Sequence, residues 1–220
     1  PRFVRFICKN LKSSEYDAIL IKNSIRFVTP ISRITDKPII LQLHNDFLNS
    51  ETPGGEDIVS KCYKIVANSE YIKKRICTIS NVSPEKVYVN MNCLDNSSFE
   101  FPSEQQKNEI ITRFNIDIHK KNIIYVGRIA KVKGVKELLL ALKNIKDNDK
   151  WHLLIVGGKW FSSNYKDKYY RELSSISKDF KEKISFLGYV KHEDIKTLYA
   201  ISSVAVVPSI WEEPAGRVVL

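Results

Sequence analysis

The apolar residues of this chain gather in short runs rich in Val, Ile and Leu, and helical patterns separate most of these runs. Such runs are typical of strands that are buried on both faces of a parallel sheet. The predicted strands are 17–21, 38–43, 64–67, 86–91, 122–126, 152–156, 184–187 and 204–207, and the predicted helices include 70–80, 104–114, 165–179 and 193–201. Strands that alternate with helices predict an α/β fold with parallel sheets.

The pattern is interrupted between Asn92 and Gln106, where Asn, Ser, Asp and Pro are frequent. Such an interruption is typical of a domain boundary. We therefore expect two Rossmann-like domains, residues 1–105 and 106–220, that face a cleft. Ser69 and Ser103 stand directly before helical patterns and are predicted to be N-caps.

The composition is that of a globular protein, with 43% hydrophobic and 27% charged residues. No stretch approaches the ~20 apolar residues that a membrane-spanning helix needs. The four cysteines lie far apart, so we expect reduced packing residues rather than disulfides or zinc ligands. Because the first residues lack an initiator Met and the apolar core of a signal peptide, we expect a cytosolic chain that continues before Pro1.

The formal net charge of +10 favours an anionic partner. Lys outnumbers Arg 26 to 9, and the lysines are spread along the whole chain. Base recognition and two-pronged phosphate contacts favour Arg, so we expect no nucleic-acid partner. The basic segment Ile72–Ile76 predicts either a weak attraction to an anionic membrane surface or an ordinary solvated helix face.

The segment Gly127–Gly134 carries two cations between a predicted strand and a helical pattern. Arg128 follows the strand, and Lys133 stands just before the helix. A helix N-terminus offers free N–H groups and partial positive charge, so fixed cations beside it make an anion site. Arg can bond two oxygens at once while Lys acts as a point charge, and this pair suits a diphosphate. A solvated basic loop explains the segment equally well.

Other candidate residues stand where predicted strands end. Glycines occur there at Gly127, Gly157 and Gly188, and His44 follows the strand at 38–43. Ligands of parallel sheets gather at the carboxyl ends of strands, and glycine lets the main chain approach a ligand closely. Ordinary turn chemistry is the alternative for the glycines, and a purely structural role is the alternative for His44.

The chain ends with Pro208-Ser209-Ile210-Trp211-Glu212-Glu213-Pro214-Ala215-Gly216 and four further residues. With the Gly127–Gly134 segment and the glycine turns, this ending resembles the retaining nucleotide-sugar glycosyltransferases of glycosyltransferase family 4. The resemblance covers nearly the whole chain and implies the GT-B fold. Residues 1–105 would be the C-terminal part of the acceptor-side domain, and 106–220 the first part of the donor-binding domain.

The chain departs from the family pattern in three places. The second glutamate of the family's Glu-x7-Glu motif would stand just after Leu220, and the glycine-rich loop of the first domain is absent. Asn92-Cys93-Leu94-Asp95 replaces the commoner Asn-Gly-x-Asp. We therefore interpret the chain as an internal fragment of a longer enzyme, with both domains incomplete.

The resemblance implies transfer of a sugar from a nucleoside-diphosphate sugar to an acceptor hydroxyl, with retention at the anomeric carbon. Arg128 and Lys133 would stabilise the departing diphosphate, Glu213 would hydrogen-bond the donor sugar, and His44 would face the sugar and the acceptor. The residues assigned to the donor are Gly127, Arg128, Lys133, Gly157, Val190, Glu213, Ala215 and Gly216. Neither a metal nor another cofactor is expected.

The resemblance further implies a hexosyltransferase-like enzyme with a donor linked to UDP. The expected acceptor is a glycan or a lipid-linked saccharide in surface polysaccharide biosynthesis, and the expected place is the cytoplasm, with peripheral attachment to the inner face of the plasma membrane. Two other functions stay open. One is a nucleotide-sugar epimerase of the same architecture, and the other is a non-catalytic binding or scaffold subunit that kept the fold.

Overall fold

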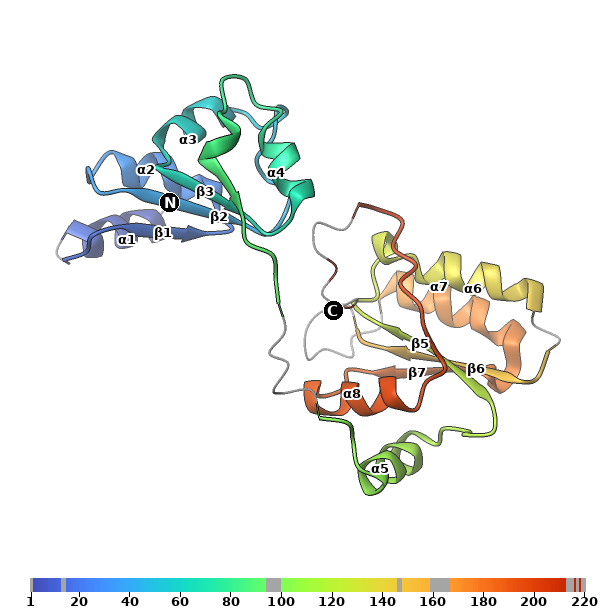
Figure 1. Ribbon diagram of the computed structural model, residues 1–220. Helices are drawn as coiled ribbons and strands as arrows, with labels where there is room; N and C mark the ends of the chain where they lie inside the picture. Colours follow the sequence, from blue (N-terminus) through green and yellow to red (C-terminus); the bar gives the residue numbers. More distant parts are fainter. Residues whose placement is uncertain are drawn as a thin grey trace. The chain divides into compact units, whose positions relative to one another are not determined.

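The computed structural model describes residues 2–12, 15–93, 100–145, 148–158, 167–212, 216 and 218. It contains two compact units, Pro1–Leu94 and Asp95–Glu213, and the final residues are divided between them. Each unit holds a sheet of four parallel strands with helices packed beside it (Figure 1). This arrangement confirms the predicted α/β fold class, and the domain boundary between residues 105 and 106 stays a prediction.

The sheet of the first unit has the order β1-β2-β3-β4, and all neighbouring strands are parallel. Its strands confirm the predicted runs, with small shifts at the ends: β1 Ile19–Lys22, β2 Ile39–Leu43, β3 Lys64–Ala67 and β4 Val87–Val89. Its helices are α1 Arg2–Lys12, α2 Val28–Ser32, α3 Gly55–Lys61 and α4 Glu70–Ile76. 3₁₀ turns cover Ile25–Phe27 and Pro84–Lys86.

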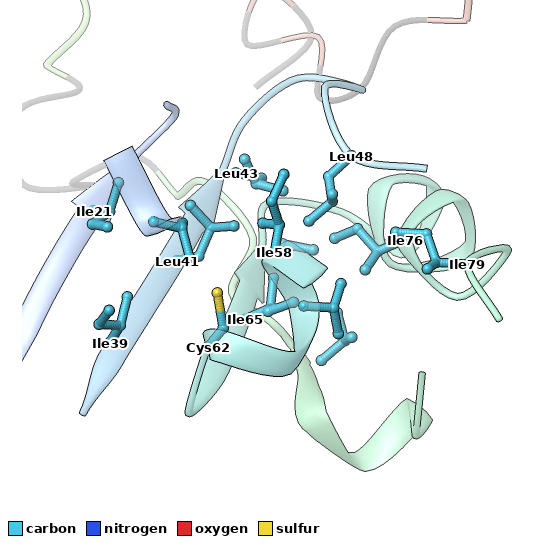
Figure 2. Close-up of a cluster of buried hydrophobic side chains, with 14 of the residues drawn as sticks. Ile21, Ile39, Leu41, Leu43, Leu48, Ile58, Cys62, Ile65, Ile76 and Ile79 are labelled. Atoms are coloured by element: carbon cyan, nitrogen blue, oxygen red, sulfur yellow. The ribbon is translucent and has the colours of Figure 1, made fainter. Parts of the chain in front are cut away.

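The core of the first unit lies between its sheet and the helices α3 and α4. Figure 2 shows Leu41 and Leu43 of β2 and Ile65 of β3 beside the helical residues Ile58 and Ile76. Each of these side chains is less than a tenth exposed. Because burying an aliphatic side chain of this size contributes about 1.5–3 kcal/mol, this cluster holds the two helices on the sheet.

Helix α4 begins where the sequence predicts and ends earlier. The Ser69 hydroxyl oxygen accepts a hydrogen bond from the Ile72 N–H at 3.3 Å, which confirms the predicted N-cap. The helix ends at Ile76, whereas the pattern predicted residue 80. The Thr78 hydroxyl donates to the Arg75 carbonyl at 2.7 Å, and such side-chain bonds to the main chain compete with helix continuation.

The sheet of the second unit has the order β7-β6-β5-β8 and is also parallel. Its strands confirm the remaining predicted runs, although β8 ends two residues before the predicted 207: β5 Lys121–Val126, β6 Trp151–Val156, β7 Ile184–Gly188 and β8 Val204–Ala205. Its helices are α5 Glu104–Phe114, α6 Val135–Leu142, α7 Lys168–Ser177 and α8 His192–Ala200. 3₁₀ turns cover Lys131–Lys133, Lys143–Ile145 and Lys178–Lys183.

Strand β6 lies between β5 and β7, and all of its residues are buried. Leu153 and Ile155 belong to the core cluster that contains residues of α6 and α7. Leu154 and Val156 belong to the cluster that contains residues of α5 and α8. Figure 1 shows these helix pairs on opposite faces of the sheet. Burial on both faces explains why the strand is apolar without interruption from Leu153 to Val156.

Helix α5 has the predicted bounds because both of its ends are determined locally. Ser103 accepts from the Gln106 N–H at 3.2 Å, and the Gln106 side chain accepts from the Ser103 N–H at 2.8 Å, which makes a capping box. Asn115 ends the helix in the left-handed conformation. An ion pair between Arg113 and Asp194, 3.0 Å long, connects α5 to α8.

All four cysteines are unpaired thiols. Cys62 is buried, and desolvation raises the pKa of its thiol to about 12. Cys8 and Cys77 pack against the same core cluster as Cys62. Cys93 is exposed, so the predicted packing role is wrong for this residue.

A short polar row crosses the second sheet near the start of its strands. Asn122 and His152 are paired in register on β5 and β6, and both are buried. The His152 Nε2 lies 2.9 Å from the Ser185 hydroxyl oxygen on β7. Burial is the main cause that lowers the pKa of His152 below 6.5, and the nearby Lys120 lowers it further.

This burial predicts a pH-dependent stability. As pH falls through 6.5, the unfolded chain takes up the His152 proton first, so the free energy of unfolding should fall between 6.5 and the lowered folded-state pKa. Above 6.5 the contribution should be constant. Urea unfolding from above to below pH 6.5 measures the slope, which His152→Gln should reduce. His119→Gln, which removes an exposed imidazole, is the control, and equal slopes in both variants would contradict the interpretation.

Candidate functional site

The loop after β5 is attached to the end of β6 through its main chain. The Gly127 N–H donates to the Val156 carbonyl at 3.0 Å, and the Ile129 N–H donates to the Gly158 carbonyl at 2.9 Å. Arg128 lies between these two attachments, and its side chain is exposed. Within the described ranges, the Arg128 guanidinium forms no ion pair. A fixed main chain therefore presents a solvated cation at the carboxyl edge of the sheet.

The Tyr125 hydroxyl also holds this loop, a role that the strand pattern does not reveal. Tyr125 is 3% exposed, and its hydroxyl donates to the Arg128 carbonyl at 2.8 Å. The Ala130 N–H donates to the same carbonyl at 3.0 Å. A Cβ atom added to Gly127 would lie 2.8 Å from the Tyr125 hydroxyl oxygen. The tyrosine therefore occupies the space that a side chain at position 127 would need.

Gly157 joins the ends of three strands. Its φ is +127°, and an added Cβ would lie 2.0 Å from the Gly127 carbonyl oxygen, so no other residue fits without displacement of the main chain. The Gly157 N–H donates to the Gly188 carbonyl at 2.7 Å. The predicted glycine turns therefore pack against one another at the carboxyl edge of β5, β6 and β7.

The start of α6 is formed by the 3₁₀ turn Lys131–Lys133 and by Gly134, which has a φ of +69°. An added Cβ at Gly134 would lie 1.8 Å from the Pro208 carbonyl oxygen. The Ile210 N–H donates to the Val132 carbonyl at 3.1 Å. The segment that follows β8 therefore lies directly against the turn that carries Lys133.

The segment Gly127–Gly134 contains Arg128, Lys131 and Lys133 but no acidic residue. The Lys133 Nζ lies 5.7 Å from the centre of the Trp211 ring. With the N–H groups of the first turn of α6, these cations make a region of positive potential. Such a region can bind a polyanion such as a diphosphate.

The other residues that the sequence assigns to the donor have different surroundings. Val190 is 5% exposed, and its side chain belongs to the core, so a ligand contact at this position would use main-chain atoms. Gly216 is partly buried. Glu213 and Ala215 lie outside the described residues. The structure therefore packs Gly127 against Gly157 and places Arg128 and Lys133 on the segment that follows Gly127.

His44 of the first unit directly follows β2, as predicted, and its main chain is held from both sides. The His44 N–H donates to the Asn23 side-chain oxygen at 3.1 Å. The Asn68 amide donates to the His44 carbonyl at 3.3 Å. Asn23 and Asn68 directly follow β1 and β3, so three neighbouring strand ends are joined. Each asparagine is the first polar residue after a strand, and this position is the signal in the sequence.

The loop beyond His44 is fixed by an acidic residue. Asp46 accepts from the Arg75 guanidinium at 2.7 Å and from the Asn49 amide at 2.8 Å. The hydrogen bond to Asp46 raises the pKa of Arg75. Among the described residues, no group of three or more His, Cys, Asp or Glu side chains could hold a metal ion. The expectation of metal-independent chemistry stays a prediction.

The close contact at Gly134 predicts a large cost of substitution. Gly134→Ala and Gly54→Ala share the cost of a left-handed main chain, about 1–2 kcal/mol, because φ is +69° and +70° at the two positions. At Gly54 an added Cβ would meet nothing within 4 Å, whereas at Gly134 it would meet Pro208. Gly134→Ala should therefore lose about 1–3 kcal/mol more in urea unfolding. Equal losses would contradict the contact.

Comparison with known proteins identifies relatives of the whole chain. Residues 106–220, more than half of the chain, match the family described as glycosyl transferases group 1. Spore coat protein SA of Bacillus subtilis is 28% identical over 225 residues, with 99% of this chain and 60% of that protein covered. The putative glycosyltransferase YtcC of B. subtilis is 25% identical over 222 residues, covering 96% of this chain and 54% of the relative.

The fold has a close counterpart among solved structures. HepE of Anabaena, crystallised in complex with UDP-glucose, has a TM-score of 0.77 at 19% identity, and the match covers 98% of this chain and 59% of HepE. The chain thus spans between 54% and 60% of the length of these three proteins. From the family match and the shared fold, the chain belongs to the glycosyl transferases group 1, glycosyltransferase family 4, with the fold of the GT-B enzymes.

Proposed function

We propose that this protein is a retaining, hexosyltransferase-like glycosyltransferase that takes its donor sugar from a UDP-sugar. The observation that carries the proposal is the exposed Arg128 on a loop with a fixed main chain, close in sequence to Lys133 and the start of α6. Family membership supports glycosyl transfer. The complex of HepE with UDP-glucose supports uridine as the base.

In this proposal the two cations divide the recognition of the diphosphate. The Arg128 guanidinium bonds two phosphate oxygens at once, and the Lys133 ammonium supplies a point charge to the other phosphate group. The N–H groups at the start of α6 point their partial positive charge at the same ligand. Because hydrogen bonds already fix the Arg128 main chain, binding orders little more than the side chain.

Charge develops on the diphosphate as its bond to the anomeric carbon breaks. Arg128 and Lys133 stabilise this charge, so that no metal ion is needed. The acceptor oxygen forms its bond to the anomeric carbon on the face from which the diphosphate departs, which retains the configuration. The acceptor proton passes to the departing phosphate oxygen, and the products are the glycoside and UDP. Loss of either cation lowers turnover by about 10²–10³-fold.

The remaining residues are proposed to contact the acceptor and the sugar, phosphate and base of the donor. His44 faces the sugar and the acceptor, with its main chain held by Asn23 and Asn68. The main chain of Val190 contacts the base, because its side chain is buried in the core. The donor sugar and phosphate are contacted by Gly127, Gly157, Glu213, Ala215 and Gly216.

The proposed acceptor is a glycan or a lipid-linked saccharide in surface polysaccharide biosynthesis, at the cytoplasmic face of the plasma membrane. None of the helices in the described part of the chain has the length and apolar character that a membrane crossing requires. In α4, Ile72 and Ile76 are buried and Arg75 pairs with Asp46. Attraction to anionic lipid through this helix would therefore depend on Lys73 and Lys74.

A second candidate is a non-catalytic subunit that binds a sugar nucleotide and transfers nothing. The observation that favours it is the relative described as a spore coat protein. Both candidates predict binding of UDP. They differ in turnover, because only the enzyme releases UDP from a UDP-sugar.

The proposal predicts that UDP stabilises the chain and that Arg128→Ala removes about half of this effect or more. UDP at about 100 times its dissociation constant adds about 2.7 kcal/mol of apparent stability. Losing hydrogen bonds to a charged group weakens binding by about ten- to a hundredfold. Thermal shift with UDP, GDP and ADP measures both effects. Arg171→Ala, an exposed arginine of α7, is the control and should bind as the wild type does.

The role of His44 predicts a loss of turnover without a loss of UDP binding. In a protein that releases UDP from a UDP-sugar, His44→Ala should lower kcat, because the imidazole faces the reacting sugar and not the diphosphate. Calorimetry with UDP and a coupled assay of UDP release measure the two quantities. Unchanged kcat would exclude this role and leave His44 as a structural residue.

A further inference from the structure

Main-chain contacts align the segment that follows β8 with the turn that carries Lys133. The Ile210 N–H donates to the Val132 carbonyl at 3.1 Å, and the Gly134 Cα packs against the Pro208 carbonyl. The side chains of Val132 and Ile210 are 41% and 58% exposed, so burial of these side chains does not explain the alignment. The main chain sets the register, and this register places Trp211 beside Lys133.

The geometry of Trp211 and Lys133 is that of a cation–π pair. The Lys133 Nζ lies 5.7 Å from the centre of the Trp211 ring, within the ~6 Å over which an ammonium is attracted to an aromatic face. Tryptophan is the strongest partner among the aromatic side chains. The ring is 39% exposed, so it is not an ordinary core residue.

Lysine benefits from such a partner because its side chain is long. A free lysine side chain samples many rotamers, so holding it in a single conformation costs conformational entropy. Because the ring holds the ammonium near the start of α6, part of this entropy is already lost in the free protein, and ligand binding loses less. An aromatic ring carries no net charge, so this contact does not itself neutralise the ammonium.

We propose that Trp211 is a positioning residue that holds the Lys133 ammonium in place for the donor diphosphate. This inference rests on the proposed function, in which Lys133 binds the diphosphate. Trp211 acts through Lys133 and makes no contact with the ligand that matters for affinity. The sequence does not reveal this role, because the two residues are separated by most of the second unit.

The test is a double-mutant cycle on UDP affinity, measured by calorimetry. Trp211→Leu should weaken UDP binding about two- to fivefold, the range for an exposed cation–π pair. Trp211→Phe keeps a ring and should lose less. In a Lys133→Met background, Trp211→Leu should change UDP affinity no further, because the residue it positions is gone. A purely structural role would show the same loss in both backgrounds.

Tyr63→Leu is the matched control. It removes an exposed ring that also has a lysine nitrogen, that of Lys64, 6.0 Å from its centre, but in the first unit. This variant should bind UDP as the wild type does. If the wild type binds UDP and Trp211→Leu binds equally well, the positioning role is overturned while the proposed function stands.

Three further outcomes would contradict the positioning role or the proposed function. Equal losses for Trp211→Leu and Trp211→Phe, or an undiminished loss in the Lys133→Met background, would overturn the positioning role. If the wild type binds none of UDP, GDP and ADP, the proposed function itself fails, and the inference fails with it.

Discussion

Gly157 packs its Cα against the carbonyl oxygen of Gly127, in a main-chain conformation that residues with side chains rarely adopt. An added Cβ would lie 2.0 Å from that oxygen, well inside contact distance. Hydrogen bonds from Gly127 to Val156 and from Gly157 to Gly188 complete the junction. Main-chain atoms thus join the ends of β5, β6 and β7. Because Arg128 is the next residue after Gly127, its position depends on this junction.

This junction fixes the main chain of the loop, which carries the exposed charge of Arg128. Tyr125 adds a buried hydroxyl to the same loop, and the Gly134 contact with Pro208 fixes the turn before α6 in a similar way. Electrostatic stabilisation of a developing charge is most effective when donors are already in place and need no reorganisation. In this unit the main-chain groups of the loop bond to one another, and the Arg128 side chain is exposed.

In the first unit, the side chains of asparagines join the ends of neighbouring strands. Asn23 and Asn68 hold the N–H and the carbonyl of His44, and both follow the strands that flank β2. Asn23 has a φ of +54°, a conformation that asparagine tolerates better than most residues. Asn68 is 4% exposed and therefore part of the interior. Strand ends of one sheet are joined by glycine packing in one unit and by asparagine hydrogen bonds in the other.

Much of the fold could be predicted because its causes are local. The apolar residues 153–156 of the predicted strand 152–156 identify a strand buried on both faces, and β6 has that burial. Ser69 and Ser103 begin helices through bonds to residues three positions later, which lie within the reach of a sequence pattern. The glycines at strand ends can also be predicted, because each directly follows a predicted strand in the sequence. The predicted helix 70–80 is longer than α4. The Thr78 hydroxyl competes with helix continuation by donating to the Arg75 carbonyl, and this bond exists only once the turn has formed.

The sequence by itself determined the strands, the caps and the order of the cations and glycines, since each follows from residues that are neighbours in the chain. Only the tertiary structure decided that Pro208 excludes a side chain at position 134 and that Val190 turns its side chain into the core. It also decided that Trp211 lies over Lys133. These contacts join segments that are distant in sequence, and which distant segments meet is set by the packing of the whole sheet and its helices.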